Sequence, residues 1–368
     1  MHWIKKTVFF LVGIIISASL SVLLLELIFG EWLGSDEWRD AENLNIIRNQ
    51  QIEYPVGHLY GNDDAFVTYT RDVYGLRDSC ERPADIDILT LGGSTTDQRY
   101  IGDGDTFQDV LQDRLTGALG RSVCISNAAV DGHSTFGHIA SFEQWFPLIP
   151  GLKPDYVLFY VGINDAGFRD GPRLAFDVNR GVGESTLRYH LRDKSAIYSL
   201  ARTIYHVLTG YSESREYAAH QSSPPSAPEY VVTRMTAGAD VLIKENTQGF
   251  SERIRLLIAE SRKMGATPVC VSQPHLFARQ FADGFKGTAR AFDYRGTTYN
   301  GLDYHASISA LNSAMNVICT ESGGAYIDLA GKAFETTDFY DAVHMTPIGA
   351  ARVGKYLFEE IKSLELLE

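Results

Sequence analysis

The sequence has few cysteines and lacks any long run of basic residues. The four cysteines form no Cys-x-x-Cys pair and no histidine–cysteine cluster with the spacing of a zinc site: Cys80, Cys124, Cys270 and Cys319. The 368 residues carry 33 Lys+Arg against 46 Asp+Glu, which gives a net charge of −13. Proteins that bind nucleic acid usually present a basic face, so we expect no nucleic-acid partner. We also expect no metal and no cofactor.

Two of the cysteines, Cys124 and Cys270, fall inside segments that we predict to be strands. A buried free thiol is the simplest interpretation of each. Disulfides are the alternative if the domain is exported, and the sequence alone does not determine which cysteines would pair.

One long apolar run stands at the N-terminus. Residues 7–29 are almost uninterruptedly apolar, with Glu26 as their one charged residue, and Lys5 and Lys6 precede them. The run is long enough to cross a bilayer as a helix. With lysines before the run and acidic residues after it, we expect residues 1–6 in the cytoplasm and 7–29 in the membrane. The remainder would be extracytoplasmic, either periplasmic or at the cell surface.

A cleaved signal peptide is the competing interpretation of this N-terminus, because Ser17-Ala18-Ser19 resembles a cleavage site. However, the apolar run continues beyond that site from Leu20 to Phe29. We therefore favour an uncleaved signal-anchor.

The rest of the chain divides into two regions. Residues 30–84 show no strong periodicity; we expect a stalk or short helix to about Gln51, and a strand over Val67–Thr70. Across residues 85–368 predicted strands alternate with predicted helices. Such alternation predicts right-handed crossovers and a parallel sheet with helices on both faces.

The predicted elements of this α/β region can be placed along the chain. The five strands are expected at residues 86–91, 123–127, 156–161, 268–272 and 325–328. Helices are expected at 106–119, 135–146, 239–263, around 311–318, and after Thr346 and Pro347, which suit the first positions of a helix. Residues 275–304 are expected to form an irregular, aromatic-rich loop.

An insertion, about residues 166–236, interrupts the alternation. Apolar residues recur within it at helical spacing: Ile197, Leu200, Ala201, Ile204 and Leu208. Residues 222–228 are rich in serine and proline, which is typical of an extended loop. A long insertion at the active end of a sheet forms either a lid or substrate wall, or a structural addition without ligand contacts.

The segment Leu89–Asp97 carries the first candidate catalytic residue. A short buried strand breaks into Gly92 and Gly93, and Ser94 follows at once. An α/β sheet binds its ligands just beyond the carboxyl ends of its strands. The glycines let the backbone turn sharply, so that the hydroxyl and the N–H of Ser94 can both face a ligand. Taken alone, the segment fits equally well a turn in which Ser94 caps a helix.

A serine nucleophile needs a base, an orienting acid and donors for the developing oxyanion. His344 and Asp341 lie three residues apart just before the last predicted helix. At that spacing the carboxylate can hold the imidazole while the other ring nitrogen faces Ser94. Gly132 follows the second predicted strand and offers a backbone N–H, and Asn164 follows the third and offers a side-chain amide.

Four segments together resemble the sequence blocks of the SGNH/GDSL hydrolase family, in the family's order: Gly92-Gly93-Ser94, Gly132, Gly162-Ile163-Asn164-Asp165 and Asp341-Ala342-Val343-His344. The resemblance covers about residue 85 to the C-terminus, apart from the insertion. It implies that Ser94 is the nucleophile, His344 the base and Asp341 its orienting acid. The oxyanion hole would be the N–H groups of Ser94 and Gly132 with the Asn164 side chain. The implied fold is a three-layer, flavodoxin-like α/β/α arrangement with a five-stranded parallel sheet.

One position departs from the family pattern, because Gly93 stands where the family name has aspartate. That aspartate is not a triad member, so we expect catalysis to be retained with a different support for the turn. A zinc hydrolase is disfavoured, since His133 and His138 are five residues apart and do not share a helical face. An α/β-hydrolase is disfavoured, since Thr96 stands at the last glycine of its Gly-x-Ser-x-Gly elbow.

These observations predict a membrane-anchored serine esterase or acyltransferase with an extracytoplasmic catalytic domain. The leading substrate is an acetyl or other acyl ester on a carbohydrate, such as an O-acetylated polysaccharide. A lipase or acyl-thioesterase is the first alternative, favoured if residues 173–230 form an apolar lid. A non-catalytic polysaccharide-binding or assembly protein with the same fold is the second.

Overall fold

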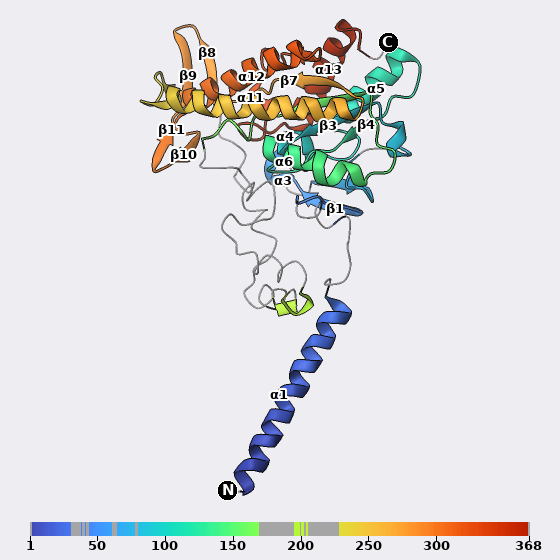
Figure 1. The fold of residues 1–368 in the computed structure, drawn as a ribbon. Coiled ribbons are helices and arrows are strands. Elements are labelled where there is room, and N and C mark those ends of the chain that lie inside the picture. Colours follow the sequence, from blue (N-terminus) through green and yellow to red (C-terminus); the bar gives the residue numbers. More distant parts are fainter. Residues whose placement is uncertain are drawn as a thin grey trace. The chain divides into compact units, whose positions relative to one another are not determined.

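The computed structural model of the chain is shown in Figure 1. It describes residues 2–30, 44–60, 65–77, 80–168 and 228–366, together with 38, 41, 195–198, 200, 201 and 204. The chain forms two compact units, one of residues 1–39 and 180–221 and the other of residues 40–179 and 222–368.

The first unit contains the N-terminal helix α1 (His2–Phe29). Its segment Lys6–Phe29 is long and apolar enough to cross a membrane by length and composition. Near its end, the Glu26 carboxylate accepts hydrogen bonds from the Ser195 hydroxyl (2.5 Å) and from the backbone N–H groups of Ala196 and Ile197 (3.2 and 3.1 Å). The described part of the expected insertion helix, at 196–198, 200, 201 and 204, is helical. Most of the insertion, including Leu208 and residues 222–227, lies outside the described residues.

The second unit is built on a five-stranded parallel sheet whose strands match the five predicted segments. They are β3 (Ile88–Gly92), β4 (Ile125–Asn127), β5 (Tyr156–Tyr160), β7 (Thr267–Val271) and β12 (Ala325–Ile327), in the spatial order β12-β7-β5-β3-β4. Side chains alternate between the two faces of such a sheet. Ile88, Leu158 and Val269 join the core under helices α5 (Phe107–Leu119) and α13 (Pro347–Ser363).

The opposite face of the sheet is covered by three further helices, α6 (Thr135–Ala140), α11 (Ala239–Lys263) and α12 (Gly301–Glu321). These helices, with α5 and α13, make the expected three-layer α/β/α fold (Figure 1). The expected helix over 135–146 is less regular than predicted. It leaves the α conformation at Ala140 and continues as a π-helical turn (Ser141–Trp145) and a 3-10 turn (Phe146–Leu148).

The strand order places the switch point of the sheet between β3 and β5. The chain moves from β3 outward to β4 and then returns to the other side of β3 to form β5. Ligands of open α/β sheets bind in the crevice at this point, beyond the carboxyl ends of the strands. Ser94 follows β3 and Asn164 follows β5, so both residues lie at this crevice.

The expectation of an irregular loop over 275–304 is wrong. Residues Ala278–Phe281 (β8) and Gly284–Thr288 (β9) pair antiparallel, and β6 (Tyr230–Val232) adds to β9. A second hairpin joins β10 (Phe292–Tyr294) to β11 (Thr297–Tyr299) through Arg295 and Gly296, which have φ of 48° and 78°. Two positive φ values in a two-residue loop are typical of a type I′ hairpin turn. Helix α12 then begins at Gly301, capped by Asn300.

The cysteines form two disulfides, Cys80–Cys124 and Cys270–Cys319, with Cα–Cα distances of 5.7 and 6.4 Å. The simplest interpretation, buried free thiols at Cys124 and Cys270, is therefore wrong. The partners lie 44 and 49 residues apart in sequence, and the fold brings them together. No free cysteine remains in the described part of the chain.

The segment expected to be a stalk also differs. Leu44 and Ile46 are buried, and β1 (Gln50–Pro55) pairs antiparallel with β2 (Phe66–Arg71), the predicted strand. A short helix, α3 (Gly57–Tyr60), follows β1. From Leu44 onward this N-terminal extension packs as part of the second unit, because its apolar side chains are buried there.

Candidate active site

Ser94 is the first residue of a single helical turn, α4 (Ser94–Asp97), directly after β3. Its side chain is half-buried. In the part of the chain that the structure describes, the backbone N–H groups of Ser94 and Gly132 donate to no protein acceptor. The first N–H groups of a helical turn have no partner within it, so they can serve a ligand.

Ser94 belongs to a hydrogen-bonded chain of three side chains. The Nε2 atom of His344 lies 2.8 Å from the Ser94 Oγ, and its Nδ1 atom lies 2.6 Å from the Asp341 Oδ2. The other oxygen of Asp341 accepts the backbone N–H groups of Val343 and His344 at 2.8 and 2.7 Å. This turn fixes the carboxylate, and the carboxylate fixes the ring. The structure thus brings together Ser94, His344 and Asp341 in the expected arrangement.

The charges of Asp341 and His344 support each other. Burial raises the pKa of Asp341, but the charge and hydrogen bond of His344 lower it by more, to about 2. Burial lowers the pKa of His344, but the charge and hydrogen bond of Asp341 raise it above its ordinary value, with a further contribution from Asp131. A carboxylate that stays ionised holds the proton on Nδ1 and leaves Nε2 to accept one from Ser94.

Asn164 lies beside the serine turn. Its side-chain Nδ2 donates to the His133 carbonyl at 2.9 Å. An amide nitrogen has two hydrogens, so one remains for a ligand. A Cβ atom placed on Gly93 would lie 2.5 Å from this nitrogen and 2.9 Å from the His133 oxygen. The segments of Gly93, His133 and Asn164 therefore meet at close range, and only glycine fits at position 93.

Gly132 lies in the loop after β4. Its φ is 78°, a left-handed conformation that glycine adopts without strain. The loop is held to the serine strand, since the Val130 N–H donates to the Gly92 carbonyl at 3.1 Å. All five residues expected at the site therefore lie in segments that follow the carboxyl ends of strands or that precede α13.

The loop that carries Asn164 is fixed by the buried carboxylate of Asp165. Asp165 accepts from the Thr135 hydroxyl at 2.6 Å and from the Thr135 N–H at 3.1 Å, and it pairs with Arg253 at 3.3 Å. Burial raises the pKa of Asp165 above its usual value, although Arg253 and the hydrogen bonds oppose this. Asp165, the second residue of the Asn164-Asp165 pair, thus ties the loop to α6 and α11.

Gln273 is a supporting residue that the sequence analysis missed. Its buried side chain donates to the Thr95 hydroxyl (3.0 Å) and the Tyr160 carbonyl (2.7 Å), and accepts from the Ile163 N–H (3.0 Å). It therefore joins the residue after Ser94 to the residue before Asn164. The sequence contained a signal for it. Gln273 directly follows the predicted strand 268–272, and a position after a predicted strand is what indicated Ser94 and Asn164.

A cavity of about 240 Å³ adjoins Asn164. Aromatic and polar side chains share its wall: Phe136, Phe168, Tyr294, Glu245, Asn246 and Arg253. The Arg253 guanidinium lies 4.1 Å from the centre of the Phe136 ring. This mixture of ring faces, charges and amides suits a polar ligand better than an alkyl chain.

His133 and His138 are both buried, and their ring centres are 5.8 Å apart. These are the two histidines considered above as zinc ligands. The His133 Nε2 atom lies 2.8 Å from the Leu44 carbonyl oxygen. Among the described residues, no group of three or more His, Cys, Asp or Glu side chains is placed to hold a metal ion.

Comparisons with known proteins point to one family. The family model described as "GDSL-like Lipase/Acylhydrolase family" matches residues 90–352. A search of the curated proteins finds no match. Among solved structures, TesA is 14% identical over 75% of this chain and 98% of its own, with a TM-score of 0.40. An acetylxylan esterase, Axe2 of Geobacillus stearothermophilus, is 12% identical over 74% and 93%, with a TM-score of 0.41. A lipase/acylhydrolase of Enterococcus faecalis is 13% identical over 76% and 97%, with a TM-score of 0.40.

The crowding at Gly93 generates a prediction. In Gly93→Ala the new Cβ must displace the Asn164 amide or the His133 carbonyl, and displacements of about 1 Å at such a site cost on the order of 10² in rate. We expect kcat for an activated ester to fall by about that factor. Gly117→Ala is the matched control, since an added Cβ there meets nothing within 4 Å on α5. Turnover of Gly93→Ala within threefold of the parent would contradict the close packing.

Proposed function

This chain belongs to the GDSL-like lipase/acylhydrolase family, and we propose that it is a serine esterase in which Ser94 is the nucleophile. His344 is its general base and Asp341 orients His344. The oxyanion hole consists of the N–H groups of Ser94 and Gly132 and the side chain of Asn164. The observation that carries the proposal is the hydrogen-bonded chain from the Ser94 Oγ through His344 to Asp341.

The first half of the reaction follows from this chain. The Ser94 Oγ attacks the ester carbonyl carbon while its proton passes to the His344 Nε2. Asp341 stabilises the imidazolium that forms, consistent with the mutual pKa shifts of the two groups. The tetrahedral intermediate then collapses, the bond to the alcohol oxygen breaks, and His344 returns its proton to the departing alcohol. The acyl group remains on Ser94.

The oxyanion of that intermediate needs donors that are in place before it forms. The N–H groups of Ser94 and Gly132 have no protein acceptor in the described part of the chain, and the Asn164 amide is already oriented by His133. Such preorganised donors interact more strongly with a full negative charge than with a carbonyl oxygen, so they favour the transition state.

The second half of the reaction releases the acyl group. Water attacks the acyl carbon while His344 takes one of its protons, and the new tetrahedral intermediate uses the same donors. When the bond to the Ser94 oxygen breaks, His344 protonates that oxygen and the carboxylic acid leaves. If a sugar hydroxyl takes the place of water, the same steps transfer the acyl group.

We propose that the substrate is an acetyl ester on an extracytoplasmic carbohydrate, with α1 as the membrane anchor. The apolar length of α1 supports the anchor. The two disulfides support an oxidising compartment outside the cytoplasm. The cavity beside Asn164 supports a carbohydrate, because it combines ring faces with hydrogen-bonding groups.

Asn164 gives the sharpest test of the mechanism. Asn164→Ala removes a donor that acts mainly on the oxyanion, so kcat should fall by about 10²–10³ while KM changes little. Asn300→Ala is the matched control: Asn300 caps α12, and its loss should lower stability by about 1 kcal/mol and leave kcat unchanged. Ser94→Ala should lose turnover altogether. If Asn164→Ala lowers Tm with no change in kcat, Asn164 is only a structural residue.

The acyl chain length separates the proposed acetylesterase from a lipase or thioesterase. We expect kcat/KM to fall along the series of acetyl, butyryl and octanoyl nitrophenyl esters, because the cavity beside Asn164 mixes charges with its aromatic rings. Acetylated xylo-oligosaccharides, followed by acetate release, test the carbohydrate part of the proposal. A kcat/KM that rises with chain length would assign the enzyme to long-chain acyl esters instead.

A further inference from the structure

The N-terminal extension, residues 44–60 and 65–77, lies outside the 90–352 segment that matches the family. It nevertheless contacts both the segment that carries Ser94 and the segment that carries His344. The turn α4 is only four residues long, and its N-cap residue Gly93 has no side chain to cap it. A single helical turn is unstable by itself, so contacts from elsewhere must hold it.

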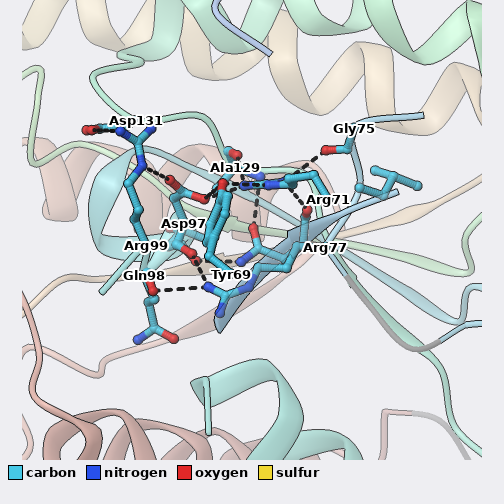
Figure 2. A network of polar contacts seen from close by, with 12 residues as sticks. Tyr69, Arg71, Gly75, Arg77, Asp97, Gln98, Arg99, Ala129 and Asp131 are labelled. Carbon is cyan, nitrogen blue, oxygen red and sulfur yellow. Dashed lines mark hydrogen bonds and ion pairs between the residues drawn. The ribbon is translucent and has the colours of Figure 1, made fainter. Parts of the chain in front are cut away.

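Arg71 of β2 supplies one set of those contacts (Figure 2). Its side chain is 3% exposed and forms an ion pair with Asp97, the last residue of α4. The same guanidinium donates to the carbonyls of Asn127 (2.8 Å) and Ala129 (2.7 Å), in the segment that leads to Gly132. The Tyr69 hydroxyl donates to Asp97 at 2.8 Å. Arg71 thus links the serine turn to the loop that carries Gly132.

Arg77 contacts the same C-terminal end of α4. Its guanidinium donates to the carbonyls of Asp97 (2.9 Å), Gln98 (3.0 Å) and Ile101 (2.6 Å). The last carbonyls of a helical turn lack partners within it, so these bonds complete it. Figure 2 shows Arg71 and Arg77 converging on Asp97 and its neighbours.

A second set of contacts reaches His344 through tyrosine rings. The Tyr340 ring is nearly parallel to the His344 ring, at 7° and 5.4 Å between centres. The edges of Tyr60 and Tyr100 pack against Tyr340, each with 6.3 Å between ring centres. The Tyr60 hydroxyl donates to the Tyr100 carbonyl at 2.7 Å. Tyr60 belongs to α3, so the extension also supports the ring that lies on His344.

We propose that the N-terminal extension is part of the active site, with Arg71 positioning Ser94 and Tyr60, through Tyr340, positioning His344. The inference rests on the proposed function, since it concerns the geometry of that catalytic pair. Productive geometry at such a site has to be held within about 0.5 Å, and it depends on packing and hydrogen bonds behind the reacting groups. The extension supplies both kinds of support, one to each partner of the Ser94–His344 hydrogen bond.

The ion pair is tested in the full-length protein. Removing Arg71 alone leaves the buried Asp97 with Arg99, 3.6 Å away, as its remaining ion-pair partner. The double variant Arg71→Met/Asp97→Asn is therefore used to remove both charges of the Arg71–Asp97 pair together. We expect kcat per folded molecule to fall at least tenfold with KM within twofold. The matched control is Arg82→Met/Asp85→Asn, which breaks an Arg–Asp pair whose arginine side chain is 72% exposed, and it should keep the parent kcat.

The tyrosine contact is tested separately, and this second test decides whether the inference holds if the double variant fails to fold. Tyr60→Leu removes the ring edge and should lower kcat about tenfold with little change in KM, whereas Tyr60→Phe keeps the ring and should recover most of the loss. Tyr356→Leu is the control, since it removes from α13 a ring that packs edge-on against Phe334.

Two results would overturn the inference. One is a kcat of Tyr60→Leu within twofold of the parent. The other is a loss of activity, in either variant, that is fully accounted for by a smaller folded fraction, measured by circular dichroism. The proposed function is checked in parallel with Ser94→Ala. If Ser94→Ala is inactive and the extension variants are normal, only the inference fails; if Ser94→Ala is active, the proposed function itself fails.

Discussion

The hydrogen bond between the Ser94 Oγ and the His344 Nε2 joins residues 250 positions apart, and the structure around it serves to keep them 2.8 Å apart. Ser94 is placed by β3 at the switch point of the sheet. His344 is placed by the turn before α13, where Thr346 and Pro347 start the helix and Asp341 binds the ring. Neither residue is held by its own short segment alone. Their geometry depends on a sheet that is buried on both faces and on loops that contact one another at its carboxyl edge.

Close contacts at that edge also explain a departure from the family pattern. Aspartate at position 93 would require a Cβ within 2.5 Å of the Asn164 amide and 2.9 Å of the His133 carbonyl. Real Cβ contacts are not that short, so this chain gains a tight junction of three loops where an acidic side chain would force them apart. The N-terminal extension contacts the serine turn through Arg71 and Arg77.

Much of this arrangement could be predicted from sequence. Apolar runs with polar residues at their ends marked all five strands, and the same signal placed Ser94, Gly132 and Asn164 at one edge. The hairpins within 278–299 were missed, because irregular aromatic spacing hid two short turns at Gly284 and Gly296. Disulfide partners and the contacts of Arg71 and Tyr60 connect residues distant in sequence. They depend on packing that no local pattern specifies, so only the structure reveals them.

A crystal structure of the enzyme after reaction with diethyl p-nitrophenyl phosphate would identify both the nucleophile and the oxyanion donors, since the phosphoryl adduct imitates the tetrahedral intermediate. The phosphorus should be bonded to the Ser94 Oγ. Its phosphoryl oxygen should lie within about 3.2 Å, hydrogen-bond distance, of the backbone nitrogens of Ser94 and Gly132 and of the Asn164 Nδ2. The Asn164 amide should keep its contact with His133 while it donates its second hydrogen. Phosphorus on another residue, or an oxygen that contacts none of these three donors, would contradict the proposed catalytic site.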